Sequence, residues 1–238
     1  MNVFVTGGSR GIGRAIARRF AADGAERIAI GYLRNDAAAE ATAEELRAAG
    51  AEVTLVRGNV TSNRVLEQVA QLGALDVLVH NAATGVVRRA LETEDKHWDW
   101  TLNANARALL SLARVAAPGM PAGASIVAIS SLGSQRVLEN YSLIGTSKAA
   151  LEALVRYLAV ELAPAIRVNA VSAGVVETGA LEHFPNRDEM LRVGASNPAE
   201  RLVTPEDVAA AVAFLCSPDA EMVRGQVLVV DGGFSLPV

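Results

Sequence analysis

The sequence has few cysteines, lysines and aromatic residues, and two of these shortages exclude classes of protein. Cys216 is the single cysteine of 238 residues, so we expect no internal disulfide and predict a reducing compartment, the cytoplasm. Lysine occurs only as Lys96 and Lys148. The 22 basic and 26 acidic residues are interspersed. Because no basic stripe is present, we expect no nucleic-acid partner.

Long apolar runs are absent as well. No uncharged apolar run approaches the ~18 residues of a membrane span, so we expect no membrane segment. The chain opens on MNVFVTGG, which leads straight into a strand pattern and does not resemble an export signal.

What the sequence does contain is an alternation of short β-branched runs with alanine-rich stretches of helical period. This alternation predicts repeated βα units around a parallel sheet. With 51% apolar residues and no linker, residues 1–238 are expected to form one α/β domain with a doubly wound, seven-stranded parallel sheet. The predicted strands cover 2–6, 27–32, 52–57, 75–80, 124–130, 166–171 and 226–230. The predicted helices cover 11–22, 36–49, 61–72, 94–117, 141–163 and 205–216.

One segment breaks this rhythm. Residues 174–204 hold several glycine, proline and asparagine residues, and the segment is far longer than a usual connection in an α/β unit. Loops of that length are usually functional lids or binding loops. We therefore predict a substrate-binding loop at about 174–204.

A glycine-rich turn follows the first predicted strand. It runs from Thr6 to Gly13 and leads directly into a predicted helix. A strand, a glycine turn and a helix N-terminus together form an anion site, because backbone N–H groups and the helix dipole face a diphosphate. The alternative interpretation is an ordinary tight βα turn.

The end of the second predicted strand bears on which nicotinamide cofactor is used. Sites that prefer NAD carry Asp or Glu about 20 residues after the glycines, whereas here residues 31–35 read GYLRN. Without a carboxylate, and with Arg10 and Arg34 available to pair with a 2′-phosphate, NADPH is favoured over NADH. The alternative for Arg34 is a solvated loop charge.

Several motifs together resemble the short-chain dehydrogenase/reductase family over essentially the whole chain. The matching residues are Thr6-Gly7 through Gly13, Asn59-Val60, Asn81-Ala82-Ala83, Asn105, Ser130-Ser131, Tyr141 with Lys148, Arg167-Val168-Asn169-Ala170 and Asp231-Gly232-Gly233. The resemblance implies a single-domain Rossmann fold, hydride transfer with a nicotinamide cofactor, and a homotetramer.

The spacing of Tyr141 and Lys148 departs from the family pattern. Ketone-reducing members place three residues between tyrosine and lysine, whereas six separate them here, and the usual tyrosine position is Ile144. Ser131 keeps its distance of thirteen residues from that position. On a helix both spacings keep the pair on one face, but the axial rise becomes roughly 10.5 Å instead of 6 Å.

A tyrosine one turn away suits a different substrate. Hydride addition to C3 of an enoyl thioester moves charge onto the C1 oxygen, and a donor at that oxygen stabilises the enolate. The six-residue gap and Ser172-Ala173-Gly174 resemble the enoyl-acyl-carrier-protein reductases, whose type III, NADPH-dependent group is the most similar. Residues 138–141, 147–154 and 183–187 are similar to that group too.

The predicted function is therefore reduction of the 2,3-double bond of an acyl thioester, carried on acyl carrier protein, in a fatty-acid or polyketide pathway. One alternative is a reductase of 3-oxoacyl thioesters or other carbonyls. Another is a catalytically inactive NADP(H)-sensing binding protein.

The resemblance also implies roles for individual residues. Tyr141 is the donor to the substrate carbonyl, and Lys148 binds the nicotinamide ribose and lowers the pKa of Tyr141. Ser131 orients the substrate or caps a turn. Asn105 holds a water beside the lysine, with Asn103 as its rival. The predicted cofactor contacts are Thr6, Gly7, Ser9, Arg10, Gly11, Ile12, Gly13, Arg34, Asn59, Val60, Asn81, Ala82, Ala83, Tyr141, Lys148, Gly174, Val176 and Thr178.

The histidine and tryptophan residues give no clear indication of a further site. His80, His97 and His183 are far apart in the sequence and no Cys/His cluster has ligand spacing, so no metal is expected. Trp98 and Trp100 are interpreted as core or subunit-contact residues.

Overall fold

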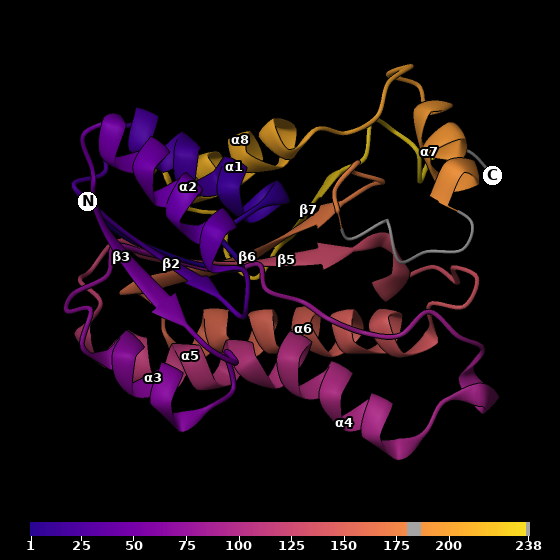
Figure 1. Cartoon of the computed structure of the whole chain (residues 1–238), viewed down its shortest axis with the longest axis horizontal. Helices are drawn as coiled ribbons and strands as arrows, with labels where there is room; N and C mark the ends of the chain where they lie inside the picture. The colour runs from indigo at the N-terminus through magenta and orange to yellow at the C-terminus, as the bar shows by residue number, and fades with distance from the viewer. Residues whose placement is uncertain (180–186, 237–238) are drawn as a thin grey trace.

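The computed structural model describes residues 1–179 and 187–236, which form an α/β fold around one parallel sheet (Figure 1). The sheet has seven strands in the order β3-β2-β1-β4-β5-β6-β7, as the sequence predicts for a doubly wound sheet. The strands are β1 (Asn2–Thr6), β2 (Arg27–Tyr32), β3 (Glu52–Arg57), β4 (Val77–His80), β5 (Ala124–Ser131), β6 (Ile166–Ala173) and β7 (Val227–Val230).

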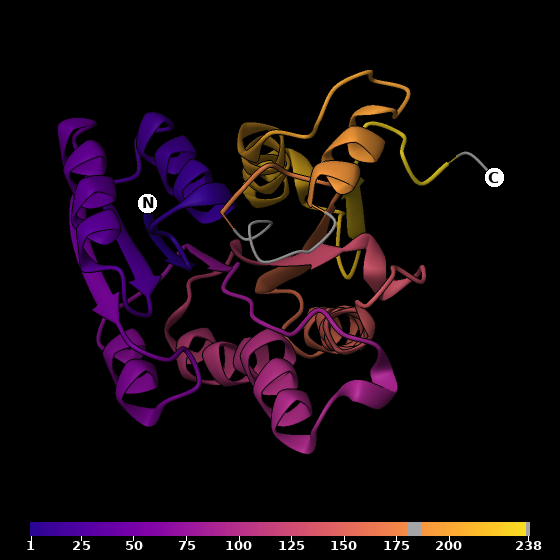
Figure 2. The same cartoon turned by 45° about the vertical axis from the view of Figure 1, so that its right-hand side comes forward.

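Helices cover both faces of the sheet (Figures 1 and 2). The described helices are α1 (Gly11–Ala22), α2 (Asp36–Ala48), α3 (Asn63–Ala70), α4 (Asp95–Leu102), α5 (Ala108–Ala116), α6 (Ser142–Glu161), α7 (Arg187–Ala195) and α8 (Pro205–Cys216). In Figure 1, α1, α2 and α8 lie above the sheet and α3 to α6 lie below it. None of the helices in the described residues is long and apolar enough to cross a membrane.

The two-residue period of β1 shows why both faces are covered. Val3 and Val5 pack into the core on the side of α1 and α8, while Phe4 between them packs into the core on the side of α5 and α6. Successive strand side chains point to opposite faces, and an all-apolar strand therefore needs helices on each side.

The predicted helix 94–117 is helical as expected, but it is not a uniform α-helix. α4 and α5 are separated by one π turn, Asn103–Arg107, which widens the backbone at the buried Asn105. Single π turns inside α-helices are frequently found at functional sites. Propensity alone does not signal this widening, because it depends on what Asn105 contacts elsewhere in the fold.

The predicted long loop is also only partly a loop. α7 lies within residues 174–204, and residues 180–186, which include His183, fall outside the described residues. α7 carries Asp188 and Glu189 in its first turn, which favours a helix, but Gly194 is its one buried residue. A helix of nine residues with one buried residue gives too little periodicity to be recognised in the sequence.

The strand order reverses between β1 and β4, which places a site at their carboxyl ends. Thr6 pairs with His80 in the parallel register of these two strands. The turn after β1 and the segment after β4 therefore begin side by side, and they form the floor of the site described next.

Candidate active site

The turn between β1 and α1 has a shape that requires glycine. Gly7 and Gly11 lie in the left-handed region, with φ of 66° and 53°. A Cβ on Gly13 would overlap the Gly7 carbonyl oxygen and lie 2.6 Å from Asn81 Nδ2. The glycine spacing thus closes a tight turn that brings the backbone up to the first turn of α1.

The start of α1 is open to an anion. Its N-cap residue, Arg10, makes no side-chain hydrogen bond to the helix, and no acidic residue lies in the first turn. By contrast, α2, α3 and α8 are capped by the side chains of Asn35, Ser62 and Thr204. Unpartnered N–H groups at a positive helix end suit the diphosphate of a dinucleotide, so the residues present fit the cofactor implied by the resemblance.

Thr6 and Asn81, both predicted to contact the cofactor, hold the turn in place from within. Thr6 Oγ1 accepts hydrogen bonds from Asn81 N (3.0 Å) and Ala82 N (2.9 Å). Asn81 Nδ2 donates to the carbonyl oxygens of Thr6 (3.0 Å) and Gly7 (3.1 Å). These bonds join the ends of β1 and β4 and lay residues 81–82 against Gly7.

Other predicted cofactor residues lie around the same turn. The Ser9 carbonyl accepts from buried Thr42 Oγ1 (3.0 Å), and Ile12 packs against the core. Thr178 lies close enough to Gly11 that a Cβ there would be 3.3 Å from Thr178 Cγ2. The segment after β6 therefore folds back onto the predicted diphosphate site.

Gly174 and Val176 hold the segment after β6 in place through contacts with neighbouring backbone. The Gly174 N–H donates to the Val230 carbonyl (2.9 Å), and Val176 is buried and bridges Val203. The side chain of Val176 is therefore used in the core, so only its backbone remains for the predicted cofactor contact.

The edge formed by β2 and β3 carries positive charge for a 2′-phosphate. Arg10 and Arg34 are exposed, and neither forms an ion pair within the described residues. Sequence reasoning missed Arg57, which the parallel register places beside Tyr32. Asp36 follows closely, but its carboxylate accepts from the Tyr32 hydroxyl (2.9 Å) and pairs with Arg57 (3.3 Å).

Asn59, expected near the adenine, is held locally. Its Oδ1 accepts hydrogen bonds from the Thr61 backbone N–H (3.1 Å) and the Thr61 hydroxyl (2.9 Å). Because both bonds use that oxygen, the predicted acceptor for an adenine amine is already engaged, while Val60 next to it lies partly buried against the core.

Tyr141 is the N-cap residue of α6, with its ring against the turn after β5. A Cβ on Gly133 would lie 2.5 Å from Cδ1 and 2.6 Å from Cε1 of that ring. Asn140, in the left-handed region at φ 58°, precedes it and accepts from Arg88 N (2.8 Å). The position of Tyr141 is thus fixed by the backbone of Gly133 against its ring and by the hydrogen bond from Arg88 to the residue before it.

Ser131 caps the turn after β5, which is one of the two roles that the sequence left open, and its role towards the substrate stays a prediction. Its Oγ accepts from the Gly133 N–H (3.3 Å), which caps the turn, and its hydroxyl hydrogen-bonds with Tyr141. Burial raises the pKa of Tyr141, and the hydrogen bond with Ser131 works against that rise. At neutral pH the phenol therefore carries its proton.

Lys148 is buried at 5% exposure, and its Nζ donates to the Ile129 carbonyl (2.7 Å). Burial lowers the pKa of Lys148 to about 8, and the Glu152 carboxylate works against that fall. The predicted lowering of the Tyr141 pKa by Lys148 is wrong for this structure, because the effect of burial dominates and the ammonium group is bonded to a β5 carbonyl.

Asn105 is fully buried in the π turn. Its side chain accepts from Thr84 N and donates to Thr84 O and to Ser147 Oγ, each at 2.8 Å. Its carbonyl oxygen faces His80 Nε2 at 2.9 Å. The side chain of Asn105 is therefore committed to protein partners, while its carbonyl oxygen keeps a second lone pair, so the water beside the lysine stays a prediction.

His80 is a site residue that sequence reasoning missed. Because the Asn105 carbonyl only accepts, His80 Nε2 carries the hydrogen, and Nδ1 accepts from the Thr6 hydroxyl (3.2 Å). Burial lowers the pKa of His80 to about 4, helped by the charge of Lys148. A neutral imidazole thus joins the diphosphate turn to the π turn. Its place at the end of β4 could have pointed to it.

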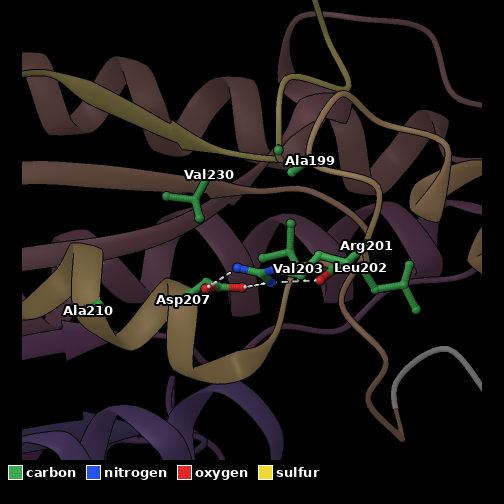
Figure 3. A pocket seen from close by; sticks show the side chains of 8 residues that line it. Ala199, Arg201, Leu202, Val203, Asp207, Ala210 and Val230 are labelled. Carbon is green, nitrogen blue, oxygen red and sulfur yellow. Dashed lines mark hydrogen bonds and ion pairs between the residues drawn. The ribbon is translucent and has the colours of Figure 1, made fainter.

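The end of the predicted substrate loop is anchored near a pocket beside β7 and α8 (Figure 3). Arg201 binds the Asp207 carboxylate at 2.5 and 2.9 Å, which holds the pKa of Asp207 well below its usual range. Asp207 and Thr204 also cap α8. Its lining includes residues 199 and 201–203 of the predicted substrate-binding loop, but none of the individually predicted catalytic or cofactor-binding residues.

The described residues, 1–179 with 187–236, contain no group of three or more side chains arranged to hold a metal. His97 instead serves the start of α4, where its Nδ1 accepts from Glu94 N (3.1 Å).

Comparison with known proteins places this site in a family. The profile described as enoyl-(acyl carrier protein) reductase matches residues 7–235. The chain is 37% identical to 1-cyclohexenylcarbonyl-CoA reductase of Streptomyces collinus, over 98% of this chain and 86% of that protein. The chain belongs to the family that this profile describes, which is part of the short-chain dehydrogenases/reductases. It is an oxidoreductase.

Solved structures of family members share the whole fold. A short-chain dehydrogenase of Burkholderia cenocepacia in complex with NADP is 32% identical, with a TM-score of 0.89 and coverage of 98% of this chain and 97% of that one. A blue fluorescent protein from a metagenomic library in complex with NADPH is 35% identical, with a TM-score of 0.88 and the same coverage.

Proposed function

We propose that this protein reduces the 2,3-double bond of an enoyl thioester with NADPH. The observation that carries this proposal is the pair of positions on α6: Ile144 fills the usual tyrosine position, and Tyr141 stands about one turn before it at the N-cap. A phenol displaced along the helix axis suits an oxygen remote from the carbon that receives hydride.

NADPH is the cofactor, and two sets of residues support it. The uncapped start of α1 suits the diphosphate, and the exposed Arg10 and Arg34 suit a 2′-phosphate. When bound, NADPH supplies a hydride to C3 of the alkene. Family members of similar structure are known in complex with NADP and NADPH.

Tyr141 acts on the thioester end of the substrate. Its raised pKa keeps the phenol protonated, so it donates a hydrogen bond to the C1 oxygen as negative charge develops there. Ser131 orients the phenol through their hydrogen bond. Lys148, charged below about pH 8, binds the nicotinamide ribose and adds positive charge beneath the site.

A conjugated thioester as substrate is also supported by the name of a relative. The Streptomyces collinus protein is called a reductase of 1-cyclohexenylcarbonyl-CoA, a compound whose name places a ring double bond beside a thioester carbonyl. We propose acyl carrier protein as the carrier for this chain, in a fatty-acid or polyketide pathway and in the cytoplasm, with coenzyme A as the alternative carrier.

We also propose a homotetramer, built through two exposed apolar faces. On the α4 and α6 side, Trp98 and Trp100 are 47% and 51% exposed and Tyr157 is 70% exposed, which excludes the core interpretation of the tryptophans. On the opposite side, Phe214 of α8 and Val229 of β7 are exposed. Patches of this kind mark protein contacts, and light scattering would give the number of chains.

Turnover of paired substrates tests the function. The purified protein is incubated with NADPH and either crotonyl or acetoacetyl thioester, each on coenzyme A and on acyl carrier protein. We expect NADPH oxidation with the crotonyl compounds. Turnover of the acetoacetyl compounds alone would overturn the proposal in favour of a carbonyl reductase.

That second function has one observation in its favour. Ser131 and Tyr141 are hydrogen-bonded, and a serine and a tyrosine hydroxyl together could polarise a ketone oxygen.

A further inference from the structure

Glu152 is a buried carboxylate that the mechanism above does not use. It lies one helical turn after Lys148 on α6 and is 4% exposed. Oε1 accepts from the hydroxyls of Ser130 and Ser134, each at 2.6 Å, and Oε2 accepts from Gln135 Nε2 at 3.5 Å. Burying a carboxylate is costly, so such a site is built only where its hydrogen bonds or its charge are needed.

The hydroxyls that Glu152 binds lie on both sides of Ser131. Ser130 precedes Ser131 at the end of β5, and Ser134 closes the short turn that Ser131 caps. Two short, charge-assisted hydrogen bonds therefore tie this turn to α6. The same helix begins at Tyr141, so Glu152 fixes the serine relative to the tyrosine.

The charge of Glu152 acts on Lys148 as well. The groups that interact with Lys148 are the Ile129 carbonyl of β5, neutral His80 of β4 and Glu152 of α6. Tyr141 is uncharged at neutral pH, so within the part of the chain described here Glu152 is the anion that opposes the effect of burial on Lys148. Geometry allows this, because residues four apart on a helix are neighbours on one face, so the carboxylate lies beside the side chain of Lys148 along α6.

We infer that Glu152 is a positioning residue of the hydride-transfer site, where its carboxylate anchors the Ser131 turn to α6 and keeps Lys148 in its charged form. The inference rests on the oxidoreductase class and not on the enoyl substrate. It therefore holds equally for reduction of an alkene or of a ketone, and its failure would leave the proposed substrate untouched.

The test uses the fact that the chain has only two lysines, Lys96 and Lys148. Protein labelled with ¹³C at lysine Cε gives two resonances, and a pH titration reports Lys148 with Lys96 as an internal reference. We expect the Lys148 midpoint near pH 8 in the unmodified protein and at least about one unit lower in Glu152→Gln, which removes the charge but keeps an acceptor.

Binding and turnover complete the test. In Glu152→Gln the affinity for NADPH, followed by its fluorescence, should weaken several-fold at pH 8 and stay near normal at pH 6.5. Ser134→Ala is the matched control, because it keeps the charge: the Lys148 midpoint should not move, while kcat with the better of the two thioesters falls.

A Lys148 midpoint that is the same in Glu152→Gln and in the unmodified protein, with only a lower Tm, would overturn the charge role. Unchanged kcat in Ser134→Ala and in Ser130→Ala would overturn the anchoring role. If Glu152→Gln does not fold, Glu152→Asp, which draws the charge back by one methylene, should lower the Lys148 midpoint by a smaller amount, and no movement would refute the inference.

Discussion

The backbone of Gly85 packs closely against the side chain of Ile144. A Cβ on Gly85 would overlap Ile144 Cγ1 and lie 2.9 Å from Cδ1. Ile144 is itself buried, four residues before Lys148 on α6. The helix position that ketone-reducing family members give to tyrosine is therefore filled by an apolar side chain, and the segment after β4 closes over it.

Gly85→Ala should destabilise the protein because the added methyl group has no room. Overpacking of this kind costs about 1–3 kcal/mol in the free energy of unfolding, measured by denaturant titration. Gly119→Ala is the control, since nothing lies within 4 Å of a Cβ there, and it should be neutral or slightly stabilising. Equal stability of the two variants would contradict the close contact.

Tyr141→Phe should lower kcat by roughly 10²-fold or more, because the donor to the thioester oxygen is lost. The Kd for NADPH should change much less than kcat, since Tyr141 is one of many predicted cofactor contacts and most of the others lie around the start of α1. Tyr157→Phe, on the exposed side of the same helix, should retain full activity. Equal activity of the two variants would exclude Tyr141 as the donor.

Glu200→Gly should stabilise the protein. Glu200 lies in the left-handed region at φ 54° and is exposed, a conformation that a non-glycine residue adopts at a cost of about 1 kcal/mol. Replacing it should raise the free energy of unfolding by roughly 0.5–1 kcal/mol, partly offset by the greater freedom of glycine in the unfolded chain. Glu40→Gly, inside α2, should lower it by about 1 kcal/mol.

The stability of the protein should fall as the pH drops through the range set by His80. The folded-state pKa is about 4 against an ordinary 6.5, so between these values the unfolded chain binds a proton that the folded chain does not. Above pH 6.5 this penalty is absent. Towards pH 4 it reaches roughly 3 kcal/mol.

Unfolding measured at pH 7 and pH 5 checks this in the unmodified protein and in His80→Gln, which removes the titrating group. The variant should lose much less stability than the unmodified protein over that interval. His97→Gln should keep the full pH dependence. If the free energy of unfolding of His80→Gln falls with pH as much as that of the unmodified protein, His80 is not the source of the pH dependence.

Local patterns in the sequence predict the sheet and the diphosphate turn. The apolar runs predict all seven strands, most clearly β1, β5 and β6, because an apolar strand covered on both faces leaves a clear signal. The run from Thr6 to Gly13 predicts its turn because glycine is needed at specific backbone angles. β5 extends one residue further than predicted, to Ser131, and β6 extends two residues further, through Ser172 to Ala173.

Features that depend on distant contacts could not be predicted. The π turn at Asn105 is held by Thr84 and Ser147, which lie 21 and 42 residues away in sequence. Arg57 reaches the cofactor edge only because β3 pairs with β2. The charge of Glu152 can be read from the sequence, but its burial beside the Ser131 turn comes from the packing of α6 against β5.

The most direct test of the central claim is a crystal structure of the protein with NADP⁺ and an unreactive acyl thioester analogue. We predict that the Tyr141 hydroxyl hydrogen-bonds to the thioester oxygen while C3 of the acyl chain faces C4 of the nicotinamide. A Tyr141 hydroxyl bound instead to an oxygen on the same carbon that faces C4 would contradict the claim and identify a carbonyl reductase.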